Sequence, residues 1–135
     1  PDLVEPLSRF GDPLGEAFQL RDDVLGVFGD STLTGKPVGD DLREGKPTLL
    51  LAIAHERADE RGRALLAQVG EPDLSADVVA DLQHLLVSTG AAAETESTIE
   101  ALSARAVAAL ADLRLPKHRT AALTELAKFV VAREA

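Results

Sequence analysis

The sequence of 135 residues contains no cysteine, no tryptophan and no tyrosine, and it has only four phenylalanines. The absence of cysteine excludes disulfide bonds, cysteine-ligated zinc and thiol catalysis, and it fits a cytoplasmic protein. Hydrophobic residues make up 45% of the chain and aromatic residues 3%, so the core must be aliphatic. Leucine and alanine are strong helix formers, and alanine lets helices approach closely. The composition therefore favours helices.

Basic residues are also scarce, because 14 lysines and arginines stand against 23 aspartates and glutamates. Nucleic-acid binding needs a basic surface, so we expect no nucleic-acid partner. No run of about 18 apolar residues occurs, and we expect no membrane span. The chain begins with Pro1-Asp2 rather than methionine and shows no signal-peptide pattern, so we interpret its start as processed or truncated.

Glycine and proline divide the sequence into segments with helical spacing of apolar residues. We predict helices at 3–10, 14–28, 47–57, 59–69, 75–89, 95–113 and 117–133. Ser75 is predicted to be an N-cap, and the last helix is expected to place Leu123, Leu126, Phe129 and Val130 on one face. The absence of strand patterns and repeats predicts a single all-α domain over residues 1–135, built as a helical bundle.

Two adjacent acids, Asp22 and Asp23, stand in the middle of a predicted helix. Their mutual repulsion would be offset by a divalent cation, and oxygen-rich sites of this kind suit Mg²⁺. Phe18 and Gln19 lie one turn before Asp22 and share its face of the helix. Taken alone, the pair is more typical of a solvated acidic surface than of a metal site.

The segment 29–46, GDSTLTGKPVGDDLREGK, is the least regular part of the chain. Lys36 and Lys46 could each donate hydrogen bonds to a phosphate, and the neighbouring glycines would let backbone amides approach an anion. Asp40 and Asp41 add further acids. A charged, flexible loop is the alternative interpretation, although long loops inside compact domains are often functional.

Other motifs fail. Gly35-Lys36 lacks the glycine spacing and the following Ser or Thr of a phosphate-binding P-loop. His55-Glu56 has no second histidine at helical spacing, and His84 and His118 have no ligand partners at suitable spacing. No arrangement of Ser, His and Asp is recognisable.

Residues 11–50, GDPLGEAFQLRDDVLGVFGDSTLTGKPVGDDLREGKPTLL, resemble the second aspartate-rich region of the trans-isoprenyl diphosphate synthases. The series Phe-Gln, Asp-Asp, Phe-Gly-Asp, Thr-Gly-Lys, Asp-Leu and Gly-Lys is too long to be a chance match. The segments 88–91, 105–113 and 130–133 are more weakly similar to later parts of the same family. The resemblance implies that the chain is the C-terminal portion of the isoprenoid synthase fold.

The resemblance also implies roles for individual residues. Asp22 would be the main Mg²⁺ ligand, assisted by Asp23, while Asp41 would support the metal site without binding metal directly. Phe18 and Gln19 would face the allylic substrate. Lys36 and Lys46 would bind the allylic diphosphate, so that Asp22 and these two lysines carry the catalytic function.

The sequence departs from the family pattern in two ways. Position 26 is usually a third acid but is Gly26 here, which leads us to expect weaker or more water-mediated metal binding. The first aspartate-rich motif and the basic site for isopentenyl diphosphate are absent. We therefore expect the chain alone to be inactive, and to pair with the missing half or to belong to a homodimer of a longer protein.

The resulting hypothesis is part of a prenyltransferase that condenses an allylic diphosphate with isopentenyl diphosphate. Mg²⁺ and lysine would stabilise the departing pyrophosphate. A non-catalytic helical subunit, or an inactive fragment of such a synthase, is the alternative. An unrelated acidic helical binding protein is a third interpretation, which leaves the Phe-Gln, Asp-Asp and Gly-Lys series unexplained. Product length and primer preference do not follow from the sequence.

Overall fold

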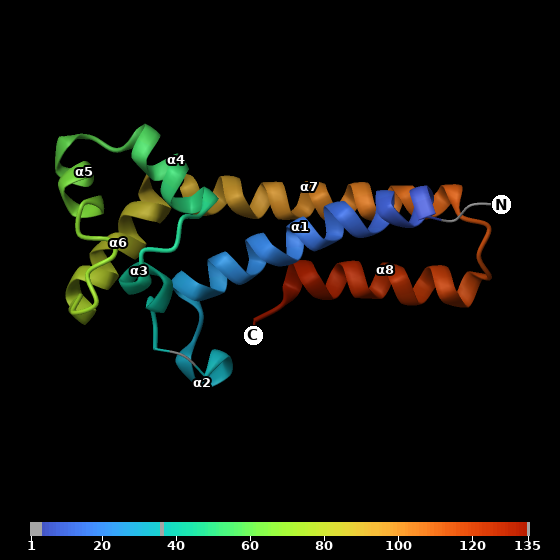
Figure 1. Ribbon diagram of the computed structural model, residues 1–135, viewed down its shortest axis with the longest axis horizontal. Coiled ribbons are helices and arrows are strands. Elements are labelled where there is room, and N and C mark those ends of the chain that lie inside the picture. Colours follow the sequence, from blue (N-terminus) through green and yellow to red (C-terminus); the bar gives the residue numbers. More distant parts are fainter. Residues whose placement is uncertain (1–3, 36, 135) are drawn as a thin grey trace. The chain divides into compact units, whose positions relative to one another are not determined.

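The computed structural model describes residues 4–35 and 37–134, and in these residues the chain is helical with no strand (Figure 1). The helices are α1 (Val4–Phe28), α2 (Ser31–Thr34), α3 (Asp40–Glu44), α4 (Leu49–Arg57), α5 (Glu60–Leu66), α6 (Ala76–Ser88), α7 (Ala91–Ala109) and α8 (Lys117–Ala132), with a 3₁₀ turn η1 at Leu110–Asp112. The predicted all-α class is confirmed. None of the described helices is long and apolar enough to cross a membrane.

The chain divides into two compact units, which are described separately. Unit 1 comprises Pro1–Arg21 and Glu96–Arg133, and unit 2 comprises Asp22–Thr95 and Glu134–Ala135. Helices α1 and α7 each contribute residues to both units. Unit 1 thus contains most of α1, most of α7 and all of α8, whereas unit 2 contains the shorter helices α2 to α6.

Helix α1 is continuous, and the predicted break at Gly11 and Pro13 is wrong. Phe10, Leu14 and Ala17 are buried at the three- and four-residue spacing of one helix face. Pro13 removes one backbone hydrogen bond from the helix. Burial of a continuous apolar stripe within unit 1 outweighs that single loss, because most helical stability in proteins comes from packing.

The ends and faces of α7 and α8 also differ in part from the prediction. Helix α7 starts at Ala91 rather than Thr95, because Gly90 alone makes the turn with a φ of 82°. In α8 the buried residues are Ala127 and Val130, whereas Leu126 and Phe129 are 47% and 58% exposed. The predicted apolar face of the last helix is therefore only partly right.

Unit 2 is organised by α4, α5 and α6, which pack against one another. Leu50, Leu82 and Leu86 are completely buried at their contacts. Each of the three helices starts at a side-chain cap: Thr48 accepts from the Leu51 amide, Asp59 from Gly62 and Ser75 from Val78. The predicted N-cap at Ser75 is confirmed.

The segment 29–46 is more ordered than predicted, because it contains the short helices α2 and α3. Asp30 caps α2 by accepting hydrogen bonds from the amide and the hydroxyl of Thr32. Gly39 and Gly45 bracket α3 in the left-handed conformation, with φ of 76° and 72°. These two turns give α3 a defined start and end within unit 2.

Candidate functional site

Four of the residues selected from the sequence lie together in unit 2. The ammonium Nζ of Lys46 is 3.1 Å from Asp23 Oδ1, 3.7 Å from Asp22 Oδ2 and 3.8 Å from Asp41 Oδ2. We call this group of Asp22, Asp23, Asp41 and Lys46 the acid cluster. Its carboxylates come from the end of α1 and from α3, and its ammonium follows α3 directly. Two segments about 20 residues apart in the sequence thus meet at one charged group.

The acid cluster combines buried and open carboxylates. The side chains of Asp23 and Asp41 are each 9% exposed, whereas that of Asp22 is 41% exposed. The Lys46 side chain is 34% exposed, so its ammonium remains accessible from solvent. Asp22 and Lys46 are therefore the members that an incoming ligand can reach first.

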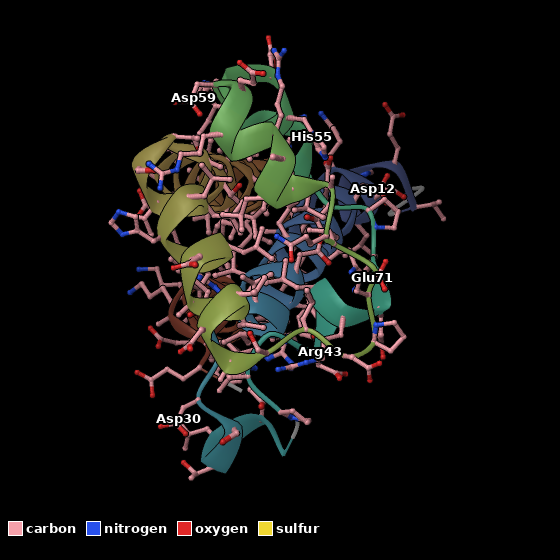
Figure 2. The ribbon with its side chains drawn as sticks, turned by 90° about the vertical axis from the view of Figure 1, so that its left-hand side faces the viewer. Asp12, Asp30, Arg43, His55, Asp59 and Glu71 are labelled. Carbon is pink, nitrogen blue, oxygen red and sulfur yellow. The ribbon has the colours of Figure 1, made fainter. Side chains whose placement is uncertain are left out.

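The helix α3 is held in unit 2 by contacts that do not involve the acid cluster. Leu42 is completely buried, and its carbonyl accepts a 2.8 Å hydrogen bond from the amide of Gly70. Arg43, labelled in Figure 2, donates to the carbonyls of Val38 and Leu74, at 2.8 and 3.2 Å. These anchors place Asp41, one residue before Leu42, at the acid cluster.

The backbone of the next turn brings Lys46 to the same place. The amide of Lys46 donates to the carbonyl of Asp41 at 3.1 Å, and Gly45 donates to the same oxygen. Gly45 approaches Gly70 so closely that an added Cβ would lie 3.0 Å from the Gly70 Cα. The glycine before Lys46 is therefore required by its left-handed conformation and by this contact.

The charge environment favours the protonated form of Lys46. The hydrogen bond with Asp23 raises the pKa of the Lys46 ammonium above its ordinary value, against an opposing contribution from burial. The charges of Asp23, Asp41 and Asp22 raise this pKa further. Lys46 is therefore a permanent cation at neutral pH, as a phosphate-binding group must be.

The remaining predicted site residues lie elsewhere. Phe18 and Gln19 belong to unit 1, where the Phe18 ring is 44% exposed and the Arg133 guanidinium lies 4.5 Å from its centroid. That distance is within the range of a cation–π contact. Lys36 lies outside the described residues. The grouping of Phe18, Gln19 and Lys36 with the metal ligands thus stays a prediction.

One buried charge in unit 1 escaped the sequence analysis. Arg21, next to Asp22 in the sequence, is 7% exposed and makes a bidentate ion pair with Glu96, at 2.6 and 2.7 Å. It also donates to the carbonyls of Val130 and Val131 at the end of α8. Sequence spacing gives no signal for this contact, because its partners are 75 to 110 residues away.

The donor chemistry of the acid cluster fits a divalent cation. Carboxylate oxygens are the preferred ligands of Mg²⁺, which typically takes one or two of them together with substrate phosphates and water. Lys46 already places a positive charge among three such groups. Within the described part of the chain, no three His, Asp or Glu residues form a metal site by themselves. A metal here would therefore need further ligands besides these carboxylates, such as water or phosphate oxygens.

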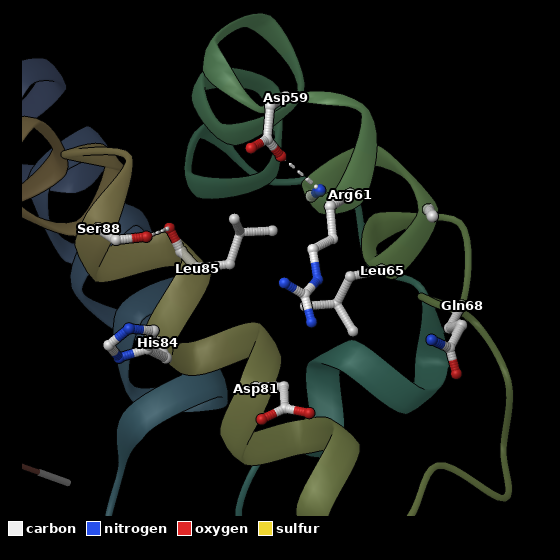
Figure 3. Close-up of a pocket in the computed structure, with 10 residues that line it drawn as sticks. Asp59, Arg61, Leu65, Gln68, Asp81, His84, Leu85 and Ser88 are labelled. Atoms are coloured by element: carbon white, nitrogen blue, oxygen red, sulfur yellow. Dashed lines mark hydrogen bonds between the residues drawn. The ribbon is translucent and has the colours of Figure 1, made fainter.

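Apart from the acid cluster, unit 2 has a hollow between α5 and α6 with a volume of about 550 Å³. Figure 3 shows that Arg61, Asp81 and His84 line it, together with the apolar Leu65 and Leu85. None of the residues predicted from the sequence to bind metal or substrate belongs to it. Among the described residues, His84 belongs to no group of three or more metal-ligating side chains.

Comparison with known proteins gives consistent similarities. Residues 1–86 match the family model described as polyprenyl synthetase. A geranylfarnesyl diphosphate synthase from Aeropyrum pernix is 40% identical over 71% of this chain and 29% of its own length. A (2E,6E)-farnesyl diphosphate synthase from Mycobacterium tuberculosis is 32% identical over 97% of this chain and 38% of its own length. This chain thus spans well under half the length of the relatives it matches.

Solved structures are similar over nearly the whole chain. Geranylgeranyl pyrophosphate synthase from Corynebacterium glutamicum, complexed with isoprenyl diphosphate and magnesium, has a TM-score of 0.92 and 40% identity, over 98% of this chain and 38% of that one. Polyprenyl synthase from Caulobacter crescentus, complexed with calcium and isoprenyl diphosphate, has a TM-score of 0.86 and 36% identity, over all of this chain and 42% of that one. The described helices therefore have the isoprenoid synthase fold.

Proposed function

Since the chain belongs to the polyprenyl synthetase family, we propose that it is the diphosphate-binding part of a trans-isoprenyl diphosphate synthase. The reaction is the condensation of an allylic diphosphate with isopentenyl diphosphate to give a longer polyprenyl diphosphate. The observation that carries the proposal is the meeting of Lys46 with Asp22, Asp23 and Asp41. A reaction that releases pyrophosphate needs both cationic donors and metal-binding carboxylates at the leaving group.

In this proposal Asp22 is the principal metal ligand and Asp23 assists it. Asp22 is the more exposed of the two, so it can reach an ion that also binds a substrate phosphate. When bound, Mg²⁺ would supply Lewis-acid stabilisation of the diphosphate charge. Both similar structures described above contain a divalent cation together with isoprenyl diphosphate, which supports this choice of ligand.

Lys46 is proposed to change partners when the substrate binds. In the structure, its ammonium lies among the carboxylates that would hold the metal. A divalent cation next to Asp22 and Asp23 would repel the ammonium and turn it towards a phosphate oxygen. Lys46 would then bind the leaving pyrophosphate as a point charge, and Lys36 is proposed to do the same. Phe18 and Gln19 are proposed to contact the allylic chain.

The remaining parts of the active site are proposed to lie outside this chain. The curated relatives and solved structures described above are more than twice as long as the portion that matches it. We propose that this chain acts together with the missing half, either within a longer protein that forms a homodimer or as a separate partner, and that it does not turn over substrate alone. This half would supply the site for isopentenyl diphosphate.

The experiment is calorimetric titration of the folded protein with pyrophosphate, with and without Mg²⁺. We expect binding that depends on Mg²⁺, and at least tenfold weaker binding in Asp22→Asn and Lys46→Met, because each removes a charge that acts on the ligand. Asp81→Asn is the matched control, because this exposed acid of α6 is outside the acid cluster. Absence of any heat in the wild-type protein would count against a competent diphosphate site.

A further inference from the structure

Gly26 lies so close to the Asp41 carboxylate that a side chain at position 26 would overlap with it. Gly26 lies in the last turns of α1, and an added Cβ would be 2.0 Å from Oδ2 and 2.4 Å from Cγ of Asp41. Real Cβ atoms essentially never come within 3.0 Å of another heavy atom. The carboxylate of Asp41 therefore occupies the volume that the side chain of residue 26 would otherwise fill.

We propose that Gly26 is a positioning residue of the diphosphate site, because it admits the Asp41 carboxylate to the acid cluster as the third acid. The same Oδ2 atom that excludes a Cβ at position 26 lies 3.8 Å from Lys46 Nζ. A side chain at position 26 and the observed Asp41 carboxylate are thus mutually exclusive. The mutual exclusion of a side chain at position 26 and the Asp41 carboxylate stands by itself. The role of this contact in binding metal and diphosphate rests on the function proposed above.

The surroundings of Asp41 leave its carboxylate few other places. Asp41 is 7% exposed, and its backbone is fixed by the burial of Leu42 and by the hydrogen bond from Lys46. Its short side chain has only χ1 and χ2 to rotate, and moving it away would take it from Lys46. A substitution at Gly26 therefore acts on the acid cluster through Asp41.

The consequence concerns the acid that the family pattern has at position 26. Its absence does not leave the cluster with two carboxylates, because Asp41 brings the number around Lys46 to three. Introducing Asp at position 26 would bring a second carboxyl group against that of Asp41, which would have to leave its observed position next to Lys46. We expect this change to damage the site, although it makes the sequence more like the family.

The test is a double-mutant cycle of Gly26→Ala, Asp41→Gly and the double variant, measured by thermal unfolding without metal. Gly15→Ala is the matched control, because Gly15 is in the same helix and an added Cβ there meets nothing within 4 Å. The control should raise Tm slightly through helix propensity. Gly26→Ala should lower Tm by several degrees, and Asp41→Gly in the same chain should remove most of that loss.

The second readout is Mg²⁺-dependent pyrophosphate affinity. Gly26→Asp should bind at least several-fold more weakly than the wild type, and the exchange variant Gly26→Asp/Asp41→Gly should recover part of the affinity. Equal or tighter binding by Gly26→Asp, with an unchanged Tm, would overturn the proposal. If the wild type binds no pyrophosphate, the proposed function fails, and the thermal cycle alone decides whether residue 26 and Asp41 exclude each other.

Discussion

The ionic contact of Arg21 in unit 1 and that of Lys46 in unit 2 differ in balance and geometry. In unit 1, the guanidinium of Arg21 meets a single carboxylate, Glu96, in a bidentate pair at 2.6 and 2.7 Å. In unit 2, the ammonium of Lys46 lies among three carboxylates at 3.1 to 3.8 Å. With one positive and three negative groups, the acid cluster has a formal charge of −2 when all are ionised.

This difference separates a structural contact from one suited to ligand exchange. A bidentate Arg–carboxylate pair with further bonds to backbone carbonyls satisfies nearly all its donors and fixes one geometry. An ammonium is a point charge that can move between several oxygens at little cost in geometry. The excess negative charge around Lys46 also leaves a place for a more highly charged cation. The chemistry of the two contacts thus favours unit 2 as the proposed ligand-binding unit.

The largest expected effect comes from breaking the pair in unit 1. Arg21→Met should lower the free energy of unfolding by about 1.5–3 kcal/mol, because it removes charge-assisted hydrogen bonds to Glu96 and to the carbonyls of Val130 and Val131. Urea denaturation followed by circular dichroism measures this. Arg9→Met is the control, since the Arg9–Asp112 pair is exposed and should contribute about 1 kcal/mol or less. Equal losses of unfolding free energy in Arg21→Met and Arg9→Met would contradict a special structural role for the Arg21–Glu96 pair.

A smaller effect is expected from removing the cation of unit 2. Lys46→Met should lower the free energy of unfolding by about 1–2 kcal/mol, because Asp23 loses a hydrogen-bond donor and three carboxylates lose their shared positive charge. Millimolar Mg²⁺ should raise Tm more in this variant than in the wild type, since the ion then fills the place of the ammonium. Lys128→Met, which affects an exposed pair with Glu125, should show neither change. If Mg²⁺ left the Tm of Lys46→Met unchanged, this result would argue against exchange of the ammonium for a metal ion.

The smallest effect is the titration of Lys46 itself. Its pKa is raised in the folded protein, so the stability it contributes is fully present below the unfolded pKa of about 10.4 and is lost as the pH rises through the folded pKa. NMR titration of the Lys46 side chain should give a midpoint above the ordinary lysine value of about 10.4. Asp23→Asn should lower this midpoint, because the Asp23 hydrogen bond is the largest cause of the shift. An unchanged midpoint would contradict the assignment of Asp23.

Local signals in the sequence predict most of the fold. Ser75 marks the start of α6, and Pro116 and Gly90 mark helix ends within about one residue of their observed positions. The errors occur where tertiary packing outweighs a local signal. Pro13 is tolerated inside α1 because Phe10 and Leu14 are buried on both sides of it. No local rule distinguishes this position from a helix start.

The site is predictable only as far as residue types are concerned. The sequence identifies Asp22, Asp23, Asp41 and Lys46 as candidates, and the resemblance relates them to one another. It does not show that Gly26 and Asp41 share one volume, because that contact depends on how α3 packs against the end of α1. Sequence patterns also do not predict the contacts of Arg21, because its partners are distant in the chain.

The single hydrogen bond between the Lys46 amide and the Asp41 carbonyl has a mechanical consequence. It ties the site's cation and its third acid to one turn, so a displacement of α3 moves the charges of Lys46 and Asp41 together. The anchors of that turn, Leu42 and Arg43, lie after Gly39 and depend little on α2. Insertions between Gly29 and Gly39 should therefore change how far this segment extends. They should leave the charges of Asp41 and Lys46 in place beside Asp22 and Asp23.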